Sequence, residues 1–418
     1  MKHESEVLII GGGVIGICSA YYLIKRGRKV VVVDKGEICS GSSYGNAGLV
    51  VPSHSVPLAA PGVLSKGLKW MFDSESPFYI KPRFDLELFK WLWKFRSACN
   101  ERHVQKAMPF IRDLSFASLQ LYEEFAAQND LEFGFEKQGM LMVFKTEKGF
   151  KDGVEEADLM QEIGLEVKIL NPAEIQELEP NIRINAIGGV FYPQDAHLIP
   201  ARFVRELARH IETEGAAIHT NTEVLGFETS NRKLTTVKTT RGDFVADEVV
   251  LASGSWSPGI AKDLQIKLPI QPAKGYSVTV ERPEKCPVIP LVLADAKVAV
   301  TPMGETLRFA GTLEMAGLDL SINKRRVNAI LKAVPQYLPD IRPENQQLIE
   351  IWRGLRPCTP DGLPFLGRLS TYDNLTIAAG HAMIGLSLGP ITGKLVSQVV
   401  GHEKPEIDLT MLKVERFG

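Results

Sequence analysis

The chain has 418 residues, and at roughly 150 residues per domain we expect more than one lobe. Its apolar share of 44% and charged share of 23% exclude a disordered chain, a collagen and a small disulfide-stapled protein. The 48 basic and 50 acidic residues leave a net charge of -2, so the molecule has no overall attraction for nucleic acid and we expect no such partner.

The cysteines and the first residues of the chain indicate in which cellular compartment we expect the protein. The five cysteines form no C-x-x-C pair, which argues against a zinc site and a disulfide framework, so we expect no metal, reduced thiols and a cytoplasmic protein. No basic region precedes the apolar run Val7–Ile24, so we expect no secretory signal. Four glycines interrupt that run, which favours a strand, a turn and a helix over a membrane span.

The beginning of the chain has the pattern of a βαβ unit. The apolar strand Val7–Ile10 is followed by the glycine-rich turn Gly11–Gly16, a helix over Ile17–Lys25 and a second apolar strand over Val30–Val33. Asp34 ends that strand, 18 residues after Gly16. A G-x-G-x-x-G turn between a strand and a helix, with an acid at this spacing, predicts a Rossmann-like dinucleotide site.

Each position of this unit has a physical task. Gly11 permits the tight turn, Gly13 lets the backbone approach a pyrophosphate, and Gly16 lets the helix lie against the strand. The helix N-terminus then faces the anion. Asp34 is expected to bind the ribose hydroxyls, and its charge disfavours NADP. The residues of this unit that we expect at the cofactor are Gly11, Gly13, Val14, Ile15, Gly16, Asp34 and Lys35.

A loop of small and hydroxyl residues, Cys39–Leu49, follows this unit. A glycine-rich loop of this length inside a domain is typical of a functional loop that approaches a flat ring and a diphosphate, although a solvated linker has the same composition. Its expected cofactor contacts are Ser42, Ser43, Asn46, Ala47 and Gly48.

Later segments alternate between helical and strand patterns. We expect helices over Phe84–Phe95, Met108–Ala127, Pro200–Glu214, Arg325–Tyr337 and Ile391–Val400. We expect strands over Met140–Phe144, Val190–Tyr192, Ile218–His219, Glu223–Phe227, Leu234–Thr239, Phe244–Leu251, Tyr276–Val280, Val298–Thr301, Leu307–Ala310 and Leu375–Ala378. The glycine turns after Val7–Ile10, Phe244–Leu251 and Leu375–Ala378 suggest one nucleotide domain built from separate segments.

The expected fold class is therefore α/β, with an α+β second domain on a mainly antiparallel sheet that is inserted between segments of the first. We expect the nucleotide-binding domain to comprise residues 1–55, 193–260 and 350–418. The substrate domain then comprises residues 56–192 and 261–349.

The combined motifs resemble the FAD-dependent D-amino-acid oxidase and glycine oxidase superfamily over nearly the whole chain. Beside the segments above, the resemblance is carried by Val249–Trp256, Gly354-Leu355-Arg356-Pro357, Thr359-Pro360-Asp361-Gly362 and Ala379-Gly380-His381. The segments Pro57–Gly62 and Lys69-Trp70-Met71-Phe72 are most similar to bacterial D-amino-acid dehydrogenases, a branch that includes D-hydroxyproline dehydrogenases. The resemblance implies further FAD contacts at Val224, Ala252, Gly254, Trp256, Gly385, Leu386, Ser387 and Leu388.

The resemblance also implies how the substrate and FAD are held. The arginine that binds the substrate carboxylate in glycine oxidases corresponds to Arg356, and a planar guanidinium can hold both carboxylate oxygens. Gly354 stands where sarcosine-oxidase relatives carry a flavin-linked cysteine, so we expect non-covalent FAD.

The chain departs from glycine oxidase at two places. Met383 replaces a second arginine, and the tyrosine expected near Val298 is absent. Tyr276 and His54 are the candidates to complete the carboxylate grip, and His381 is the candidate catalytic residue in the glycine turn beside the flavin edge. Each has a plainer interpretation, as a half-buried strand residue, a loop histidine and a helix cap, respectively.

The resemblance implies oxidation of a D-amino or D-imino acid by hydride transfer to flavin N5, with cis-4-hydroxy-D-proline or D-proline as the narrower expectation. The electrons then pass to a quinone or another acceptor. An alternative is an oxygen-using oxidase of the glycine or sarcosine type. A third hypothesis, from another class, is a peripheral membrane-binding protein whose aromatic segment Phe84–Phe95 lies in the membrane interface, although domain packing explains the same pattern.

Overall fold

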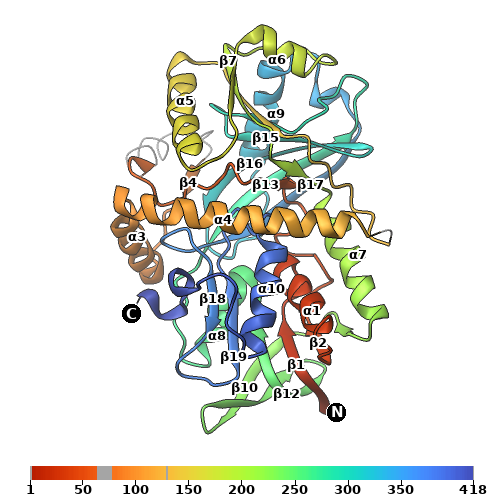
Figure 1. Ribbon diagram of the computed structural model, residues 1–418, viewed down its shortest axis with the longest axis vertical. Helices are drawn as coiled ribbons and strands as arrows, with labels where there is room; N and C mark the ends of the chain where they lie inside the picture. Colours follow the sequence, from red (N-terminus) through yellow and green to blue (C-terminus); the bar gives the residue numbers. More distant parts are fainter. Residues whose placement is uncertain (1, 64–77, 129, 418) are drawn as a thin grey trace.

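The structure, a computed structural model, describes residues 2–63, 78–128 and 130–417. Two large sheets dominate it, and Figure 1 shows them on opposite sides of the long helix α4 (Glu101–Ala126). The segment Lys69–Phe72, which contributed to the family resemblance, lies outside the described residues.

The first sheet has the strand order β10-β11-β12-β1-β2-β9, and β19 and β18 extend it from β12. Its central strands β1, β2, β9, β12 and β19 pair in parallel. The continuous apolar run Val30–Val33 is buried throughout, as a strand covered on both faces requires. The strands are β1 (Lys2–Ile10), β2 (Val30–Val33), β9 (Ala217–His219), β10 (Val224–Ser230), β11 (Lys233–Thr239), β12 (Gly242–Leu251), β18 (Phe365–Arg368) and β19 (Leu375–Ala379).

Helices α1 (Val14–Ile24), α7 (Pro200–Thr213) and α10 (Gly389–Val400) pack on the first sheet around the largest apolar core. Gly393 of α10 lies directly against the backbone of Cys18 in α1, where a Cβ would be closer than 3.0 Å. The Tyr122 hydroxyl donates to the Leu386 carbonyl at 2.7 Å and so attaches α4 to the turn before α10.

The second sheet has the strand order β17-β13-β16-β15-β14-β5-β7-β6, with β4 beside β16. It is mainly antiparallel, and among its described strands the pairs β14–β5 and β16–β4 are parallel. The strands are β4 (Phe78–Ile80), β5 (Met140–Phe144), β6 (Lys168–Leu170), β7 (Gly188–Tyr192), β13 (Gln271–Glu281), β14 (Leu291–Leu293), β15 (Val298–Met303), β16 (Thr306–Met315) and β17 (Leu348–Cys358).

Helices α5 (Glu147–Glu162), α6 (Pro172–Leu178) and α9 (Lys324–Tyr337) contact the second sheet. The remaining elements are α3 (Leu86–Ala98), α8 (Ser257–Lys262) and the two-stranded pair β3 (Leu49–Val50) and β8 (Ala196–His197). In the part of the chain that is described, no helix is both long and apolar enough to span a bilayer.

The predicted fold class is confirmed, because segments of the first sheet alternate along the chain with segments of the second. The exact domain boundaries stay a prediction, and one of them needs adjustment. Residues 350–358 belong to β17, which pairs with β13 in the second sheet, so the expected segment 350–418 begins too early.

One helix begins earlier than predicted, and another was not predicted. Helix α4 begins at Glu101 rather than Met108, because the Asn100 side chain caps it by accepting from the His103 N–H, and Pro109 is accommodated inside it. Helix α5 was not predicted, since Gly149 and Gly153 weaken its pattern, but Thr146 caps its first turn by accepting from Gly149.

Candidate active site

One cavity of about 1540 Å³ lies between the two sheets. This volume exceeds the roughly 300–1,000 Å³ of ordinary small-molecule sites, so it has room for an extended cofactor and a substrate together. Of the site residues expected from the sequence, all except Gly16, Gly48 and Leu388 line it.

The glycine turn after β1 has the geometry that a dinucleotide requires. Gly11 has φ +121 and Gly16 packs on it, since a Cβ on Gly16 would be closer than 3.0 Å to the Gly11 carbonyl oxygen. Gly13 is the N-cap of α1 and makes no side-chain cap, while Ser43 Oγ accepts from the N–H of Val14. The N-terminus of α1 borders the cavity at Gly13, Val14 and Ile15 and directs its positive dipole end there, as a pyrophosphate site does.

Asp34 lies at the carboxyl end of β2, beside the glycine turn. Its carboxylate accepts hydrogen bonds from the N–H groups of Gly12 at 2.7 Å and Gly36 at 2.8 Å. Burial raises the pKa of Asp34, while these two hydrogen bonds oppose that shift. Asp34 therefore holds the glycine turn in place and also lines the cavity.

The loop Cys39–Leu49 is folded against both sheets, so its interpretation as a solvated linker was wrong. Ser43 Oγ accepts from the N–H of Val14 at 3.0 Å, and Ser42 Oγ donates to the Leu355 carbonyl. The buried Arg308, which the sequence analysis missed, donates to the carbonyls of Asn46 at 2.8 Å and Tyr44 at 3.3 Å.

The turn before α10 also lines the cavity. Ser387 Oγ accepts from the N–H of Val51 at 3.2 Å and donates to the Leu49 carbonyl at 3.1 Å. Among the described residues, no backbone hydrogen bond uses the N–H groups of Gly385, Leu386 or Ser387. These donors and the uncapped start of α10 provide positive potential where an electron-rich ring edge would lie.

Taken together, these features fit FAD. An anion cradle at α1, an acid at the end of β2 and a line of backbone donors before α10 border one continuous cavity. Further expected contacts that line it are Val224, Ala252, Gly254 and Trp256. Leu388 is instead buried in the core, and Gly48 packs against the Leu198 carbonyl at a φ of +79.

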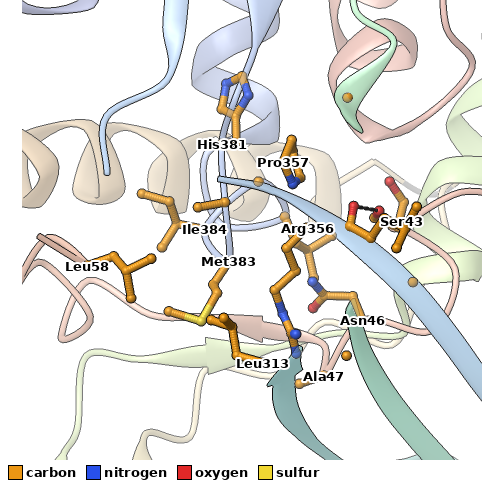
Figure 2. A pocket seen from close by; sticks show the side chains of 18 of the residues that line it. Ser43, Asn46, Ala47, Leu58, Leu313, Arg356, Pro357, His381, Met383 and Ile384 are labelled. Carbon is orange, nitrogen blue, oxygen red and sulfur yellow. Dashed lines mark hydrogen bonds between the residues drawn. The ribbon is translucent and has the colours of Figure 1, made fainter. Parts of the chain in front are cut away.

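Arg356 projects from β17 into the cavity. Figure 2 shows its guanidinium extending between Asn46 and Ala47 on one side and Leu313 on the other. The guanidinium lies over Gly275, where a Cβ would be closer than 3.0 Å, and it donates to the Thr312 carbonyl at 2.8 Å. No carboxylate of the described residues forms a salt bridge with Arg356, and burial lowers its pKa.

Tyr276 is not brought together with Arg356. Ala273 pairs with Arg356 and Tyr276 with Arg353, so Tyr276 points to the opposite face of the sheet. The Tyr276 hydroxyl donates to Glu314 at 2.7 Å and accepts from the Asn323 N–H at 3.3 Å. Burial raises its pKa.

His381 is also turned away from the guanidinium, as Figure 2 shows. Its Nε2 lies 3.1 Å from the Thr392 hydroxyl on α10, and burial lowers its pKa to about 3. This geometry favours the plainer interpretation, in which a neutral His381 supports the first turn of α10.

His54 lines the same cavity as Arg356. Its Nδ1 lies 3.3 Å from Ser53 Oγ, which donates in turn to Asp195 at 2.5 Å. Ser53 and Asp195 were missed by sequence reasoning, because residues 53 and 195 are far apart in the chain and neither stands in a motif.

The fold and the cavity define a flavin-dependent oxidoreductase. The family model described as FAD dependent oxidoreductase matches residues 6–399, so the chain belongs to that family, and FAD is its cofactor.

Individual relatives agree with this assignment. A D-amino acid dehydrogenase from Granulibacter bethesdensis is 32% identical over 99% of this chain and 100% of its own, and one from Vibrio atlanticus is 32% identical with the same coverage. Glycine oxidase from Geobacillus kaustophilus has a TM-score of 0.79 at 25% identity and covers 100% of both chains. L-proline dehydrogenase from P. horikoshii shares the fold, with a TM-score of 0.76 at 21% identity over 100% of this chain and 98% of its own.

Proposed function

We propose that this enzyme is a D-amino-acid or D-imino-acid dehydrogenase. The observation that carries the proposal is the Arg356 guanidinium, which lies over Gly275 in the cavity that the cofactor cradle borders and has no carboxylate partner among the described residues. A cation placed this way is suited to an anionic substrate group. The names of the relatives at 32% identity support a D-amino acid as the substrate.

The reaction that we propose uses few residues. FAD, when bound, would supply the acceptor for the hydride of the substrate α-carbon. Arg356 holds the substrate carboxylate with two hydrogen bonds and so fixes the α-carbon. The N–H groups before α10 stabilise negative charge on the cofactor. We propose that FAD is held non-covalently, since Cys358 is buried outside the cavity lining and Gly354 lines it.

An apolar wall supports the narrower proposal that the substrate is a cyclic imino acid, cis-4-hydroxy-D-proline or D-proline. Leu58, Leu313, Met383 and Ile384 line the cavity near Arg356. A wall of this kind excludes water and accommodates a compact ring of carbons better than a charged side chain.

The proposed acceptor is a quinone or another carrier rather than oxygen. Turnover of D-proline is expected with a quinone analogue or a redox dye under nitrogen, with little oxygen consumption in air. An oxygen electrode that records turnover at the same rate in air without the dye would favour the alternative, an oxidase of the glycine or sarcosine type.

We also propose that α3 touches an anionic membrane surface from the cytoplasmic side. On its inner face, Leu88, Trp91 and Phe95 are packed in a core cluster, as the alternative interpretation of domain packing expects. On its outer face Trp93 is nevertheless exposed by 71%, and Phe84, just before the helix, is exposed by 90%. Lys90 and Arg96 are exposed on the same helix and would attract anionic lipids.

Flotation with vesicles tests this contact. The wild-type protein is expected to float with vesicles rich in anionic lipid, and a variant with F84S and W93S is expected to stay at the bottom, because apolar burial is lost. The substitution L225S, at another exposed apolar residue on β10, is the matched control and should float. A wild-type protein that remains at the bottom contradicts the membrane proposal.

A further inference from the structure

A chain of three polar groups runs inward from the cavity wall at His54. Ser53 Oγ lies 3.3 Å from His54 Nδ1 and 2.5 Å from Asp195 Oδ2, and the Ser53 N–H donates to Asp195 Oδ1 at 3.1 Å. His54 lines the cavity, whereas Ser53 is 4% exposed and Asp195 is 0% exposed. The chain therefore links the substrate space to a carboxylate in the interior.

Asp195 is an unusual group to bury. Both of its oxygens accept from Ser53, and no salt bridge to it occurs among the described residues. A buried carboxylate is ordinarily paired with a cation, and one without such a partner is a candidate functional group.

The pKa shifts of Asp195 and His54 agree with the geometry of this hydrogen-bond chain. Burial raises the pKa of Asp195 to about 7, against the two Ser53 hydrogen bonds. Burial, together with the nearby Lys297, lowers the pKa of His54 to about 4. Tyr192 is the other titratable group beside Asp195, and Glu156 faces Tyr192. At neutral pH the imidazole is therefore neutral and the carboxyl group is near its midpoint.

The hydrogen-bond chain determines which nitrogen of His54 carries the proton. A serine hydroxyl has one proton to donate. When Asp195 is ionised, the Ser53 hydroxyl donates its one hydrogen bond to the carboxylate. The Ser53 oxygen can then only accept a hydrogen bond from His54 Nδ1. His54 then carries its proton on Nδ1, and Nε2 is left as an acceptor.

We propose that Ser53 and Asp195 are positioning residues that make His54 the acceptor of a proton from the substrate ammonium group. The inference rests on the proposed function, because only the neutral amine can release the α-hydride as a hydride. One N–H bond of the ammonium breaks and one forms at His54 Nε2. The Nδ1 proton passes to Ser53, and the Ser53 proton passes to Asp195.

The charge balance of this transfer favours it. Before the transfer, the site holds an ammonium cation and a carboxylate anion, and afterwards both are neutral. His54 and Ser53 each gain one proton and lose one. The interior therefore acquires no new charge, which avoids the large cost of an isolated ion in an apolar environment.

Flavin reduction measured against pH by anaerobic rapid mixing with D-proline tests the proposal. D195N and S53A are each expected to slow reduction about 100-fold near pH 7, within the usual range for positioned proton transfer. Both variants should approach the wild-type rate as the pH rises to 10 and above, because a growing share of the amine then arrives already neutral. A merely structural role would lower the rate at every pH.

A second readout does not depend on activity. A carboxyl group whose folded-state pKa is raised contributes stability below its unfolded value near 4, and that stability is lost as the pH rises through about 7. Urea unfolding should therefore show wild-type stability falling between pH 4 and pH 7 relative to D195N. The same urea unfolding curves also identify any variant that fails to fold.

Glu179 offers a matched control. It is a buried carboxylate whose pKa is also raised by burial, but it accepts from the N–H groups of Val288 and Ile289 and does not line the cavity. E179Q is expected to change stability and to leave the pH profile of flavin reduction unchanged.

The outcomes separate the two proposals. A wild-type flavin that no D-amino or D-imino acid reduces would overturn the proposed function, and the inference would fall with it. If substrate reduces the wild-type flavin, two results overturn only the role of the hydrogen-bond chain. In the first, D195N and S53A are reduced as fast as the wild type at pH 7. In the second, both variants are slowed as much at pH 10 as at pH 7. The role of the hydrogen-bond chain is also overturned if the stability of D195N depends on pH in the same way as that of the wild type.

Discussion

Replacement of Arg356 by methionine is expected to lower kcat/KM for a D-amino acid by about 30-fold to 1,000-fold, corresponding to about 2–4 kcal/mol of lost transition-state binding. The physical reason is that the guanidinium is the group placed over Gly275 to receive the carboxylate. R356K keeps the charge but loses the planar fork, so an intermediate loss is expected. Steady-state kinetics with a redox dye measures both variants.

The control is a second buried arginine. Arg308 donates to the carbonyls of Tyr44 and Asn46 in the flavin loop and does not line the cavity. R308M should therefore weaken FAD binding, whereas R356M should retain FAD and lose substrate affinity. An R356M enzyme with unchanged KM and kcat would contradict the assignment of the carboxylate site.

The substitution G16A is expected to weaken FAD binding about 100-fold or more. A Cβ at Gly16 would press on the backbone oxygen of Gly11, and backbone atoms cannot yield as a flexible side chain does. Helix α1 would have to move away from β1, and its N-terminus would leave the pyrophosphate position. Fluorescence titration of the FAD-free protein with FAD measures the change.

Gly226 in β10 provides the comparison for G16A. A Cβ at Gly226 reaches only Asp263 Oδ2, at 4.0 Å, and Gly226 does not line the cavity. G226A should therefore bind FAD as the wild type does. G16A protein with wild-type FAD affinity would show that the close packing of α1 on the glycine turn is not needed.

The first βαβ unit could be predicted closely from the sequence. Its apolar strands are short, its glycines are closely spaced and its contacts are local, so β2 lies where it was predicted, while β1 begins at Lys2 and α1 at Val14, ahead of the predicted Val7 and Ile17. The segment around Arg356 was harder, because its glycine and proline residues disfavour a strand. It forms one nonetheless, since β13 supplies a complete pairing partner.

The site was predictable only where one residue type implies one geometry. Glycines at the cofactor and Arg356 belong to that class. The side-chain partners of Tyr276 and His381 depend on strand alternation and on α10, and the contact of Ser53 with Asp195 joins residues that are 142 apart in sequence. No local pattern encodes such contacts.

The central claim is that the cavity holds a D-amino or D-imino acid against FAD. Its most direct test is anaerobic mixing of the purified enzyme with the D- and L-enantiomers of proline, followed through the visible absorbance of the oxidised flavin. We expect the D-enantiomer to bleach the flavin and the L-enantiomer to leave it oxidised. Bleaching by the L-enantiomer alone, or by neither proline nor any other D-amino acid, would contradict the account.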